Sequence, residues 1–480
     1  MTSSVAGSQQ SGSQRSGRNS FDVVVIGAGP AGSTAALRAG ALGARVALLD
    51  RRRLGGTCTN TGCVPTRVLA ITARLLRDIR GARAYGIHVG EPRLEWAETV
   101  ARVRQTIGDI GNMKRVQDKL REQGGEVLLE GSASFQDAHT VRLAETGREL
   151  SAEKFILAVG GRAKRLPFPG AELALTPDQL IELPELPGSV VIVGSGYTGV
   201  QITTILRAFG TAVTLLETAP EILPPADADV SRELRASFER QGIRVVTGVS
   251  GVERLEQAAD GLQRLTYSVG GEQRSVEASA VMLAVGWPAD IEGLRLEAAG
   301  VQVERGFITV NDQLQTTAPH IFVAGDANGR DMLVQGAHFE AELAAENAVT
   351  GEAQPYSRLS LPSGGFTDPD HAGVGLTERQ ARDAGLDYLV AVSRYADLER
   401  AIIDSRTTGF LKLIAERGTG RIIGAHGTGE NAVEVMQAAA AAMAAGATAA
   451  TLAGVRFAYP TYTAVVGEAA RKLERLRDAR

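Results

Sequence analysis

The chain repeats one pattern of an apolar strand followed by a glycine loop, at Phe21–Ile26 and again at Val190–Val193. The loop glycines are Gly27, Gly29 and Gly32 in the first copy and Gly194, Gly196 and Gly199 in the second. Each copy continues into a second apolar run that ends in an acid, Asp50 or Glu217. Loops and acids share one offset of 167 residues, since 194 − 27 and 217 − 50 are equal. This repeat predicts two similar βαβ units.

Each unit has the features of a dinucleotide site. The first glycine permits a tight turn, the second lets the backbone approach a pyrophosphate, and the third lets the helix pack on the strand. The helix N-terminus then offers N–H groups to the phosphates. An acid about twenty residues further on can accept hydrogen bonds from ribose hydroxyls. The repeated context favours two nucleotide sites over glycine-rich turns without a ligand.

Glu217 also bears on which nucleotide the second unit takes. A carboxylate at this position repels a 2′-phosphate and binds a free hydroxyl, and no arginine occurs at positions 218–223. We therefore expect NADH to be preferred to NADPH.

Composition excludes several other classes of protein. The 480 residues carry 51 Lys and Arg against 55 Asp and Glu, so the net charge of −4 does not indicate a nucleic-acid binder. Two cysteines are too few for a disulfide-stapled scaffold or a multi-cysteine zinc protein. No stretch has about twenty strongly apolar residues, and the nearest, the alanine-rich Ala438–Ala450, is interpreted as a packed helix. We expect no membrane contact and a cytoplasmic location.

Both cysteines lie in the segment Gly55-Gly56-Thr57-Cys58-Thr59-Asn60-Thr61-Gly62-Cys63-Val64-Pro65. In a regular helix their spacing would give about 7.5 Å of axial rise, more than the roughly 4.4–6.8 Å that a disulfide allows between Cα atoms. The backbone must therefore depart from a regular helix if the sulfurs are to bond, and Gly62 permits this. A zinc site is the alternative, but no further ligand motif supports it, so we predict no metal site.

This segment resembles the signature of the flavoprotein disulfide reductases, the family that contains dihydrolipoamide dehydrogenase, glutathione reductase and mercuric reductase. Other stretches resemble the family too. The ends of two nucleotide-domain strands in the family resemble Ala158-Val159-Gly160 and Ala284-Val285-Gly286. Its second FAD motif resembles Thr316–Asp326. Strands of its dimerisation domain resemble Phe366–Glu378, Gly409–Ile414 and Arg421–Gly427.

The resemblance implies an α/β fold with two Rossmann-like domains, for FAD and NAD, and a C-terminal α+β dimerisation domain in a homodimer. The predicted divisions are a disordered tail at 1–20, FAD-binding residues at 21–169, an NAD-binding domain at 170–290, a return to the FAD domain at 291–354, and the dimerisation domain at 355–480. An import signal is the alternative for the tail.

The resemblance also implies roles for single residues. Cys63 would lie against the flavin, Cys58 would exchange with the substrate, and Tyr197 would cover the nicotinamide pocket when it is empty. Asp326 would hold the ribityl chain. The remaining residues expected to bind cofactor are Gly56, Thr57, Gly160, Gly325 and Gly286. Electrons would pass from NADH to FAD, then to the Cys58–Cys63 disulfide, and from the dithiol to an acceptor.

Two departures from the family pattern concern the chemistry. Family members that turn over dithiols share a His-Pro-Thr segment followed by Glu. The similar segment of this chain has Tyr459 in place of the His and Ala464 in place of the Glu. Tyrosine can donate a proton but is a poor base at neutral pH. Where the family has a Lys and Glu pair beside the flavin, this chain has Arg67 and Gln201, so a guanidinium would face a neutral amide and raise the flavin potential.

Three functions remain open from the sequence. The first is an NADH-preferring flavoenzyme working through Cys58 and Cys63 on a small-molecule or thiol/disulfide acceptor. The second is a metal-ion or quinone reductase, similar to mercuric reductase, in which flavin delivers electrons directly. The third is a redox-sensing flavoprotein without turnover.

Overall fold

The computed structural model describes residues 19–258, 260–356 and 361–479. Residues 1–18 of the tail predicted at 1–20 lie outside them. Ser20, the last residue of that prediction, is instead the first residue of strand β1. The chain divides into two compact units. The first holds residues up to 54 together with 115–160 and 289–356, and the second holds 55–114, 161–288 and the C-terminal part from 357.

The first unit is built on a seven-stranded sheet, in which six strands follow the order β3-β2-β1-β6-β5-β4 and the seventh, β16, also pairs with β6. The parallel strands are β1 (Ser20–Ile26), β2 (Val46–Leu49), β3 (Glu126–Leu128), β6 (Glu149–Leu157) and β16 (Ile321–Val323). Antiparallel strands β4 (Ala133–Asp137) and β5 (Thr140–Leu143) form one edge. β14 (Val303–Glu304) and β15 (Phe307–Ile308) form a separate hairpin.

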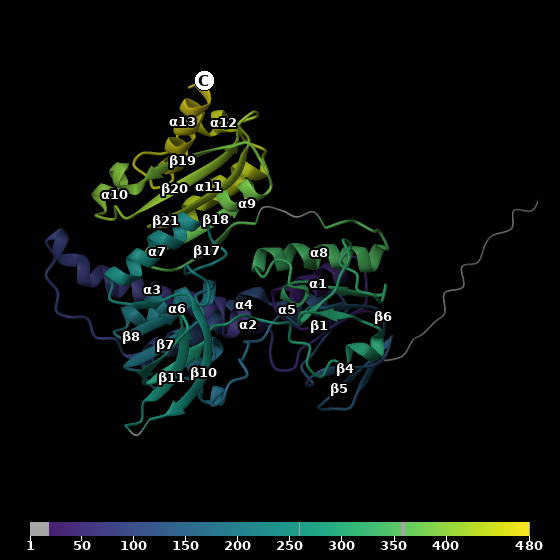
Figure 1. The fold of residues 1–480 in the computed structure, drawn as a ribbon. Helices are drawn as coiled ribbons and strands as arrows, with labels where there is room; N and C mark the ends of the chain where they lie inside the picture. The colour runs from purple at the N-terminus through teal and green to yellow at the C-terminus, as the bar shows by residue number, and fades with distance from the viewer. Residues whose placement is uncertain (1–18, 259, 357–360, 480) are drawn as a thin grey trace, which may run out of the picture. The chain divides into compact units, whose positions relative to one another are not determined.

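Helices α1 (Pro30–Ala41) and α8 (Val334–Thr350) cover one face of this sheet and pack on each other (Figure 1). Their buried faces are mostly alanine, which lets the two backbones approach closely. α5 (Val116–Glu122) packs beside α1. β2 is buried along its whole length, the pattern expected of a parallel strand covered on both faces.

The second unit contains a parallel sheet with the order β13-β7-β8-β9 and a three-stranded antiparallel sheet. These strands are β7 (Ser189–Val193), β8 (Ala212–Leu216), β9 (Arg244–Val246), β13 (Ala280–Leu283), β10 (Val249–Gln257), β11 (Gln263–Val269) and β12 (Glu272–Ala278). The accompanying helices are α6 (Tyr197–Ala208), α7 (Ala228–Arg240), α2 (Gly56–Asn60), α3 (Cys63–Gly81) and α4 (Trp96–Lys114). The predicted repeat is therefore present as two parallel βαβ units.

The C-terminal part of the second unit is α+β. Its antiparallel sheet has the order β17-β18-β21-β20-β19. The strands are β17 (Ser363–Gly365), β18 (Asp370–Gly375), β19 (Tyr388–Arg394), β20 (Gly409–Glu416) and β21 (Ile422–Gly429), and the helices are α9 (Glu378–Asp383), α10 (Glu399–Ile403), α11 (Ala432–Ala444), α12 (Ala449–Gly454) and α13 (Ala464–Asp478).

The alanine-rich segment is two helices and not the single one expected. Gly446 has a φ of +68°, in the left-handed region, and it follows the end of α11 at Ala444. The observed fold class is the one predicted, mixed α/β with two nucleotide-type sheets and a C-terminal α+β domain.

Candidate active site

The first glycines of the two loops adopt the same backbone conformation. Gly27 has a φ of +100° and Gly194 a φ of +98°, which side-chain-bearing residues rarely adopt. A Cβ atom at Gly27 would lie 2.3 Å from the carbonyl oxygen of Ala158, and one at Gly194 would lie 2.4 Å from that of Ala284. Each glycine therefore lies directly against the residue that follows the neighbouring parallel strand, and any other residue would force the backbones apart.

The third glycines bring each helix onto its own loop. A Cβ at Gly32 would lie 1.7 Å from the carbonyl oxygen of Gly27, and one at Gly199 would lie 2.0 Å from that of Gly194. The helices begin directly after the second glycines, Gly29 and Gly196. Their first N–H groups have no partner within the helix and can receive phosphate oxygens.

Asp50, at the end of β2, is tied to the first loop. One carboxylate oxygen accepts a hydrogen bond from the backbone N–H of Ala28 (2.8 Å), and the other accepts one from the N–H of Arg52 (3.0 Å). A carboxylate has about four lone-pair sites, so each oxygen keeps capacity for a ribose hydroxyl. Together with a glycine cradle that a Cβ would fill, this fits an adenine dinucleotide.

Glu217 holds the equivalent place in the second loop but uses its oxygens more fully. One oxygen accepts from the N–H and the hydroxyl of Ser195, at 2.8 and 2.6 Å. The other accepts from the hydroxyl of Thr218 (3.1 Å) and the N–H of Ala219 (2.8 Å). Burial raises the pKa of Glu217, but these hydrogen bonds outweigh it and leave the pKa below its usual value. The carboxylate is therefore charged at neutral pH.

The second predicted FAD motif lies beside the first loop. Gly325 has a φ of +77°, and a Cβ there would lie 3.2 Å from the Cβ of Ala31, at the start of α1. Asp326, the next residue, is desolvated, and this burial raises its pKa. The first unit thus joins two motifs that are almost 300 residues apart in the sequence, since 326 − 27 is 299.

Glu340 on α8 was not identified from the sequence. It is fully buried, and one oxygen accepts from the N–H of Gly325 (2.7 Å) and the side-chain amide of Asn328 (2.8 Å). Burial raises its pKa to about 7. A single acid on the otherwise alanine-rich buried face of α8 is the signal that could have revealed it. Glu340 fixes the loop that carries Asp326.

Gly160 and Gly286, the ends of the predicted strand motifs, both have left-handed φ values, +67° and +113°. The carbonyl of Gly160 accepts from the N–H of Asp290, and that of Gly286 accepts from the N–H of Lys164, each at 3.0 Å. Each glycine therefore turns the chain where it leaves a nucleotide-type sheet.

The two cysteines lie on separate helices. Cys58 is half-buried on the five-residue helix α2, and Cys63 is the exposed first residue of the 19-residue helix α3. Gly62 lies between them, and its N–H donates to the carbonyl of Thr57 (2.7 Å). Gly56, with a φ of +56°, begins α2. The departure from a regular helix expected at Gly62 is therefore present.

Arg67 and Gln201 both contact Phe366 and are not paired with each other. The Arg67 guanidinium lies 3.6 Å from the centre of the Phe366 ring. The Gln201 amide donates to the carbonyl of Tyr197 (2.7 Å) and accepts from the N–H of Phe366 (3.2 Å). Since backbone groups occupy both ends of that amide, the guanidinium rests on the aromatic ring. Burial is the first of two causes that lower the Arg67 pKa, and the neighbouring Arg74 is the second.

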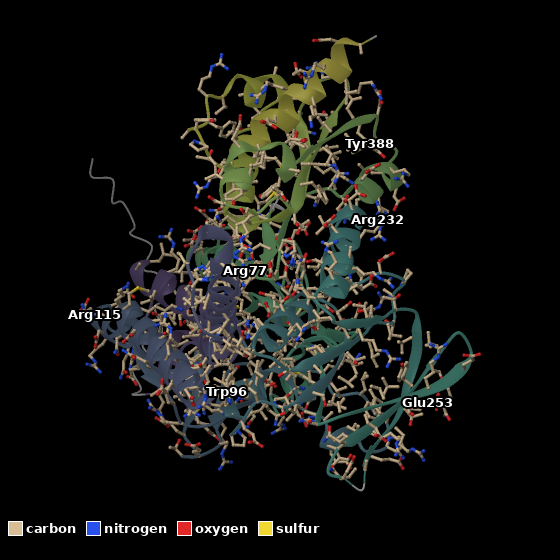
Figure 2. The ribbon with its side chains drawn as sticks, turned by 90° about the vertical axis from the view of Figure 1, so that its left-hand side faces the viewer. Arg77, Trp96, Arg115, Arg232, Glu253 and Tyr388 are labelled. Carbon is tan, nitrogen blue, oxygen red and sulfur yellow. The ribbon has the colours of Figure 1, made fainter. Side chains whose placement is uncertain are left out.

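An ion-pair cluster ties α3 to the C-terminal sheet. Arg74 pairs with Asp370 at 2.7 Å, and Arg77 pairs with Asp368 at 3.0 Å and with Glu430 at 3.1 Å. Figure 2 shows Arg77 on α3, close to the C-terminal part. Burial raises the pKa of Asp370 to about 6. The cluster positions the helix that carries Cys63, and sequence spacing alone did not indicate it.

Tyr197 begins α6 and contacts the C-terminal sheet. Its ring is nearly parallel to that of His371 on β18, with 5.9 Å between the ring centres and 13° between the planes. Its hydroxyl lies 3.3 Å from that of Ser363 on β17. The residue expected to cover the nicotinamide pocket therefore has a defined resting place.

Comparison with known proteins agrees with this arrangement. Residues 21–341 match the model of the pyridine nucleotide-disulphide oxidoreductases, and residues 361–470 match the dimerisation domain of the same group. The chain belongs to the pyridine nucleotide-disulphide oxidoreductase family.

Relatives in this family carry several names. A dihydrolipoyl dehydrogenase of Chlorobaculum parvum is 34% identical over 94% of this chain and 96% of its own length. A mercuric reductase of Bacillus cereus is 33% identical over 90% of this chain and 68% of its own length. A glutathione reductase of a Nostoc species is 31% identical over 89% of this chain and 94% of its own length. The family establishes an oxidoreductase that depends on FAD and a pyridine nucleotide, and the dimerisation domain supports a homodimer.

The C-terminal segment carries Tyr459 and Ala464 at the positions where the resemblance led us to expect a His and a Glu. Tyr459 is 77% exposed, and Ala464 is the first residue of α13. Glu468, one turn further along α13, is half-buried, and this burial raises its pKa.

None of the helices in residues 19–258, 260–356 and 361–479 is long and apolar enough to cross a membrane. Within the same ranges no three His, Cys, Asp or Glu side chains gather as metal ligands.

Proposed function

We propose that this enzyme takes electrons from NADH, in preference to NADPH, and delivers them through Cys58 and Cys63 to an acceptor that requires little base catalysis. The observation that carries the proposal is the break at Gly62, which separates Cys58 on α2 from Cys63 at the start of α3. α2 packs against α3, so both cysteines lie near one end of the long helix.

The two thiols have different surroundings, and we assign them different roles. Cys63 is the first residue of α3, where the positive end of the helix dipole favours a thiolate. Cys58 precedes it on a short helix, and we assign to it the exchange with the acceptor. Bound FAD, held by the loop of Gly27, Gly29 and Gly32 with Asp50 and Asp326, supplies the two-electron carrier between the nicotinamide and these thiols.

The preference for NADH rests on the charge around Glu217. The buried carboxylate follows the second strand of this unit, and we propose that it faces the adenosine ribose of a nucleotide on the second loop. Its lowered pKa keeps it charged. Residues 218–223 offer no cationic side chain to a 2′-phosphate. A 2′-phosphate would therefore meet negative charge without a compensating arginine or lysine.

The choice of acceptor rests on the C-terminal segment. Oxidation of a dithiol substrate requires proton removal, for which relatives of the usual pattern carry a His and a Glu. Tyr459 and Ala464 stand at those positions. Loss of a positioned base lowers rates by about 10²- to 10⁴-fold. We therefore propose that the reduced enzyme passes its electrons to a metal ion, a quinone or a reactive electrophile, and that it does not oxidise a dithiol substrate.

An anaerobic NADH titration with the Cys58→Ser and Cys63→Ser variants tests the proposal. The wild-type protein should develop long-wavelength thiolate-to-flavin absorption on reduction. Cys63→Ser should lose this absorption. Cys58→Ser should keep NADH-dependent flavin reduction but lose nearly all acceptor turnover in a stopped-flow panel of disulfides, metals and quinones.

Two results would contradict the proposal in different ways. If Cys58→Ser retains most acceptor turnover, the flavin delivers electrons directly and the thiol pair is dispensable. If no acceptor in the panel oxidises the reduced wild-type protein, the chain is a redox-sensing flavoprotein without turnover.

A further inference from the structure

The resting place of Tyr197 is supplied by the C-terminal sheet and not by the nucleotide-type sheet to which Tyr197 belongs. Ser363 and His371 lie on β17 and β18, which pair with each other directly. Tyr197 stacks on the His371 ring and its hydroxyl lies 3.3 Å from the Ser363 hydroxyl. Two parts of the second unit that are remote in sequence therefore meet at this one aromatic ring.

His371 is held in a single protonation state and orientation. The Thr367 hydroxyl donates its only proton to the carbonyl of Pro369 (2.6 Å), so the 2.9 Å contact between this hydroxyl and Nδ1 requires Nδ1 to carry the proton. Nε2 is then an acceptor, with no partner among the described residues. The side chain is buried, which lowers its pKa to about 4 and keeps the ring neutral at pH 7.

Gly365 makes room for this imidazole. A Cβ atom at Gly365 would lie 2.3 Å from Cε1 of His371 and 2.7 Å from Nε2. The backbone of β17 thus packs against one edge of the ring while Tyr197 covers a face. Since the imidazole is fixed by Thr367 and Gly365, it offers Tyr197 a rigid surface.

Tyr197 itself is less firmly enclosed. It is half-buried, and a cavity of about 130 Å³ lies beside it, lined among others by Tyr197, Ser363, His371, Gln380 and His426. Space next to the ring means that close packing does not fix its position on every side. The stacking on His371 and the contact with Ser363 therefore set where the ring rests.

We propose that His371 is a positioning residue for nicotinamide entry, which holds Tyr197 in the resting position that NADH must displace. The inference rests on the proposed function, since it takes the loop of Gly194, Gly196 and Gly199 to be the NADH site. When a ligand binds only one of two conformations, its apparent Kd is the intrinsic Kd divided by the fraction of molecules in the conformation that binds. The Tyr197–His371 contact would therefore set the affinity for the nicotinamide end and leave the adenosine end unaffected.

The test compares two ligands by titration calorimetry on the oxidised, FAD-loaded protein. Tetrahydro-NAD is a non-reducing analogue of NADH that has to displace Tyr197, and ADP-ribose lacks the nicotinamide ring. We expect His371→Leu to bind tetrahydro-NAD roughly 2- to 10-fold more tightly, the range for loss of one aromatic pair. Its affinity for ADP-ribose should stay unchanged.

Three further variants make the comparison specific. Ser363→Ala, which removes only the hydroxyl contact, should give a smaller gain of about twofold, and it keeps the test valid should His371→Leu fold poorly. Tyr197→Ala should bind tetrahydro-NAD tightly and abolish the effect of His371→Leu. His426→Leu removes the other buried imidazole at the same cavity, which bonds to the carbonyl of Leu376 and not to Tyr197, and should leave both affinities unchanged.

Steady-state kinetics add a second readout. His371→Leu should lower KM for NADH and leave kcat unchanged, because the contact acts before the chemical step. Equal changes for tetrahydro-NAD and ADP-ribose, or no change for either, overturn the positioning role while leaving the nucleotide site in place. A wild-type protein that binds neither ligand overturns the NADH site and this inference with it.

Discussion

Asp50 and Glu217 occupy equivalent positions in the two nucleotide loops but differ in what they can still accept. Asp50 accepts two backbone N–H groups and keeps lone pairs for a ribose, whereas Glu217 accepts four hydrogen bonds from within the protein. A ribose hydroxyl at Glu217 must replace a bond, and the 3.1 Å contact to the Thr218 hydroxyl is the longest of the four. The charge of Glu217 then matters more than its hydrogen bonding.

Glu217→Gln tests that view. The amide removes the charge, and its N–H₂ group faces hydrogen-bond donors that the carboxylate had accepted from. We therefore expect kcat/KM for NADH to fall about tenfold or more. The ratio of NADH to NADPH activity should fall as well, since the repulsion of a 2′-phosphate is lost. Glu221→Gln, on the same loop and half-buried in an ion pair with Arg235, is the control and should change the ratio little. An unaltered NADH to NADPH ratio in Glu217→Gln would contradict the assignment.

Protonation of His371 should give the protein a measurable dependence of stability on pH. Its folded pKa of about 4 lies below the ordinary value of 6.5, so the stability is complete above pH 6.5 and is lost as the pH falls from 6.5 toward 4. We expect wild type to lose about 2 kcal/mol relative to His371→Leu between pH 7 and pH 5.

The comparison with His371→Leu is needed because other groups act in the opposite direction. Burial raises the pKa of Asp370 to about 6 and that of Glu340 to about 7. Protonation of these two carboxyls therefore stabilises the folded protein as the pH falls. Thermal unfolding of the two proteins across this pH range measures the difference. Parallel melting curves at every pH would show that the His371 ring is not held neutral by the fold.

We expect Arg67 and Gln201 to affect the reduction potential of the flavin. The guanidinium stays charged although burial lowers its pKa, and Gln201 supplies no counter-charge. We therefore expect a higher flavin potential than in the Arg67→Lys, Gln201→Glu double variant, measured by anaerobic redox titration. A wild-type potential below that of the double variant would reverse this conclusion.

At the scale of the elements, α3 is the part of the fold whose position matters most for the thiols. It begins at Cys63, and its Arg67, Arg74 and Arg77 side chains all reach residues of the C-terminal part. These arginines are spaced so that they lie along one side of the helix. The helix is therefore fixed along its length by contacts remote in sequence.

Arg77→Gln should reveal how much this anchoring contributes. Arg77 is mostly buried and pairs with Asp368 and Glu430. Its loss removes the ion pair of Asp368 and one of the arginines around Glu430, which keeps Arg74. We expect a loss of about 2–3 kcal/mol in stability, seen as a lower melting temperature. Asp78→Asn, next to it and about half exposed, should cost under about 0.5 kcal/mol. Equal effects of the two substitutions would mean that the cluster is only a surface network.

Parts of the fold could be predicted wherever residues close together in the sequence determine them. The two glycine loops, the acids at 50 and 217 and the break at Gly62 follow from spacing and backbone sterics, and the structure has them where they were expected. Glu340 and His371 were not predicted as parts of the site, because their roles depend on partners brought close only by the fold. The pairing expected between Arg67 and Gln201 was replaced by contacts to Phe366, a residue 165 positions beyond Gln201.

At the scale of the whole molecule, α3 also presents an apolar stripe. Ile71, Leu75 and Ile79 are exposed in the single chain at spacings of four residues, which place them on one side of the helix. The dimerisation domain supports a homodimer, and we predict that a second copy of this chain covers the stripe.

Leu75→Glu should therefore weaken the dimer. A buried charge without a partner costs several kcal/mol, so light scattering coupled to gel filtration should show a monomer at concentrations where wild type is dimeric. Ile403→Glu, an exposed apolar residue on α10, is the control and should leave the dimer intact. A dimeric Leu75→Glu protein would place the contact between copies elsewhere.

The near-identity of the two glycine loops also matters for anyone designing a chemical probe. First glycines with φ values of +100° and +98° lie against carbonyls at almost the same distance. A compound that imitates only the diphosphate and its adenosine would find two receptors in one polypeptide. We expect selectivity to come from the ribose, where Asp50 and Glu217 differ in their free lone pairs, and from the far end of the compound, where the first site would take a tricyclic ring and the second a pyridine.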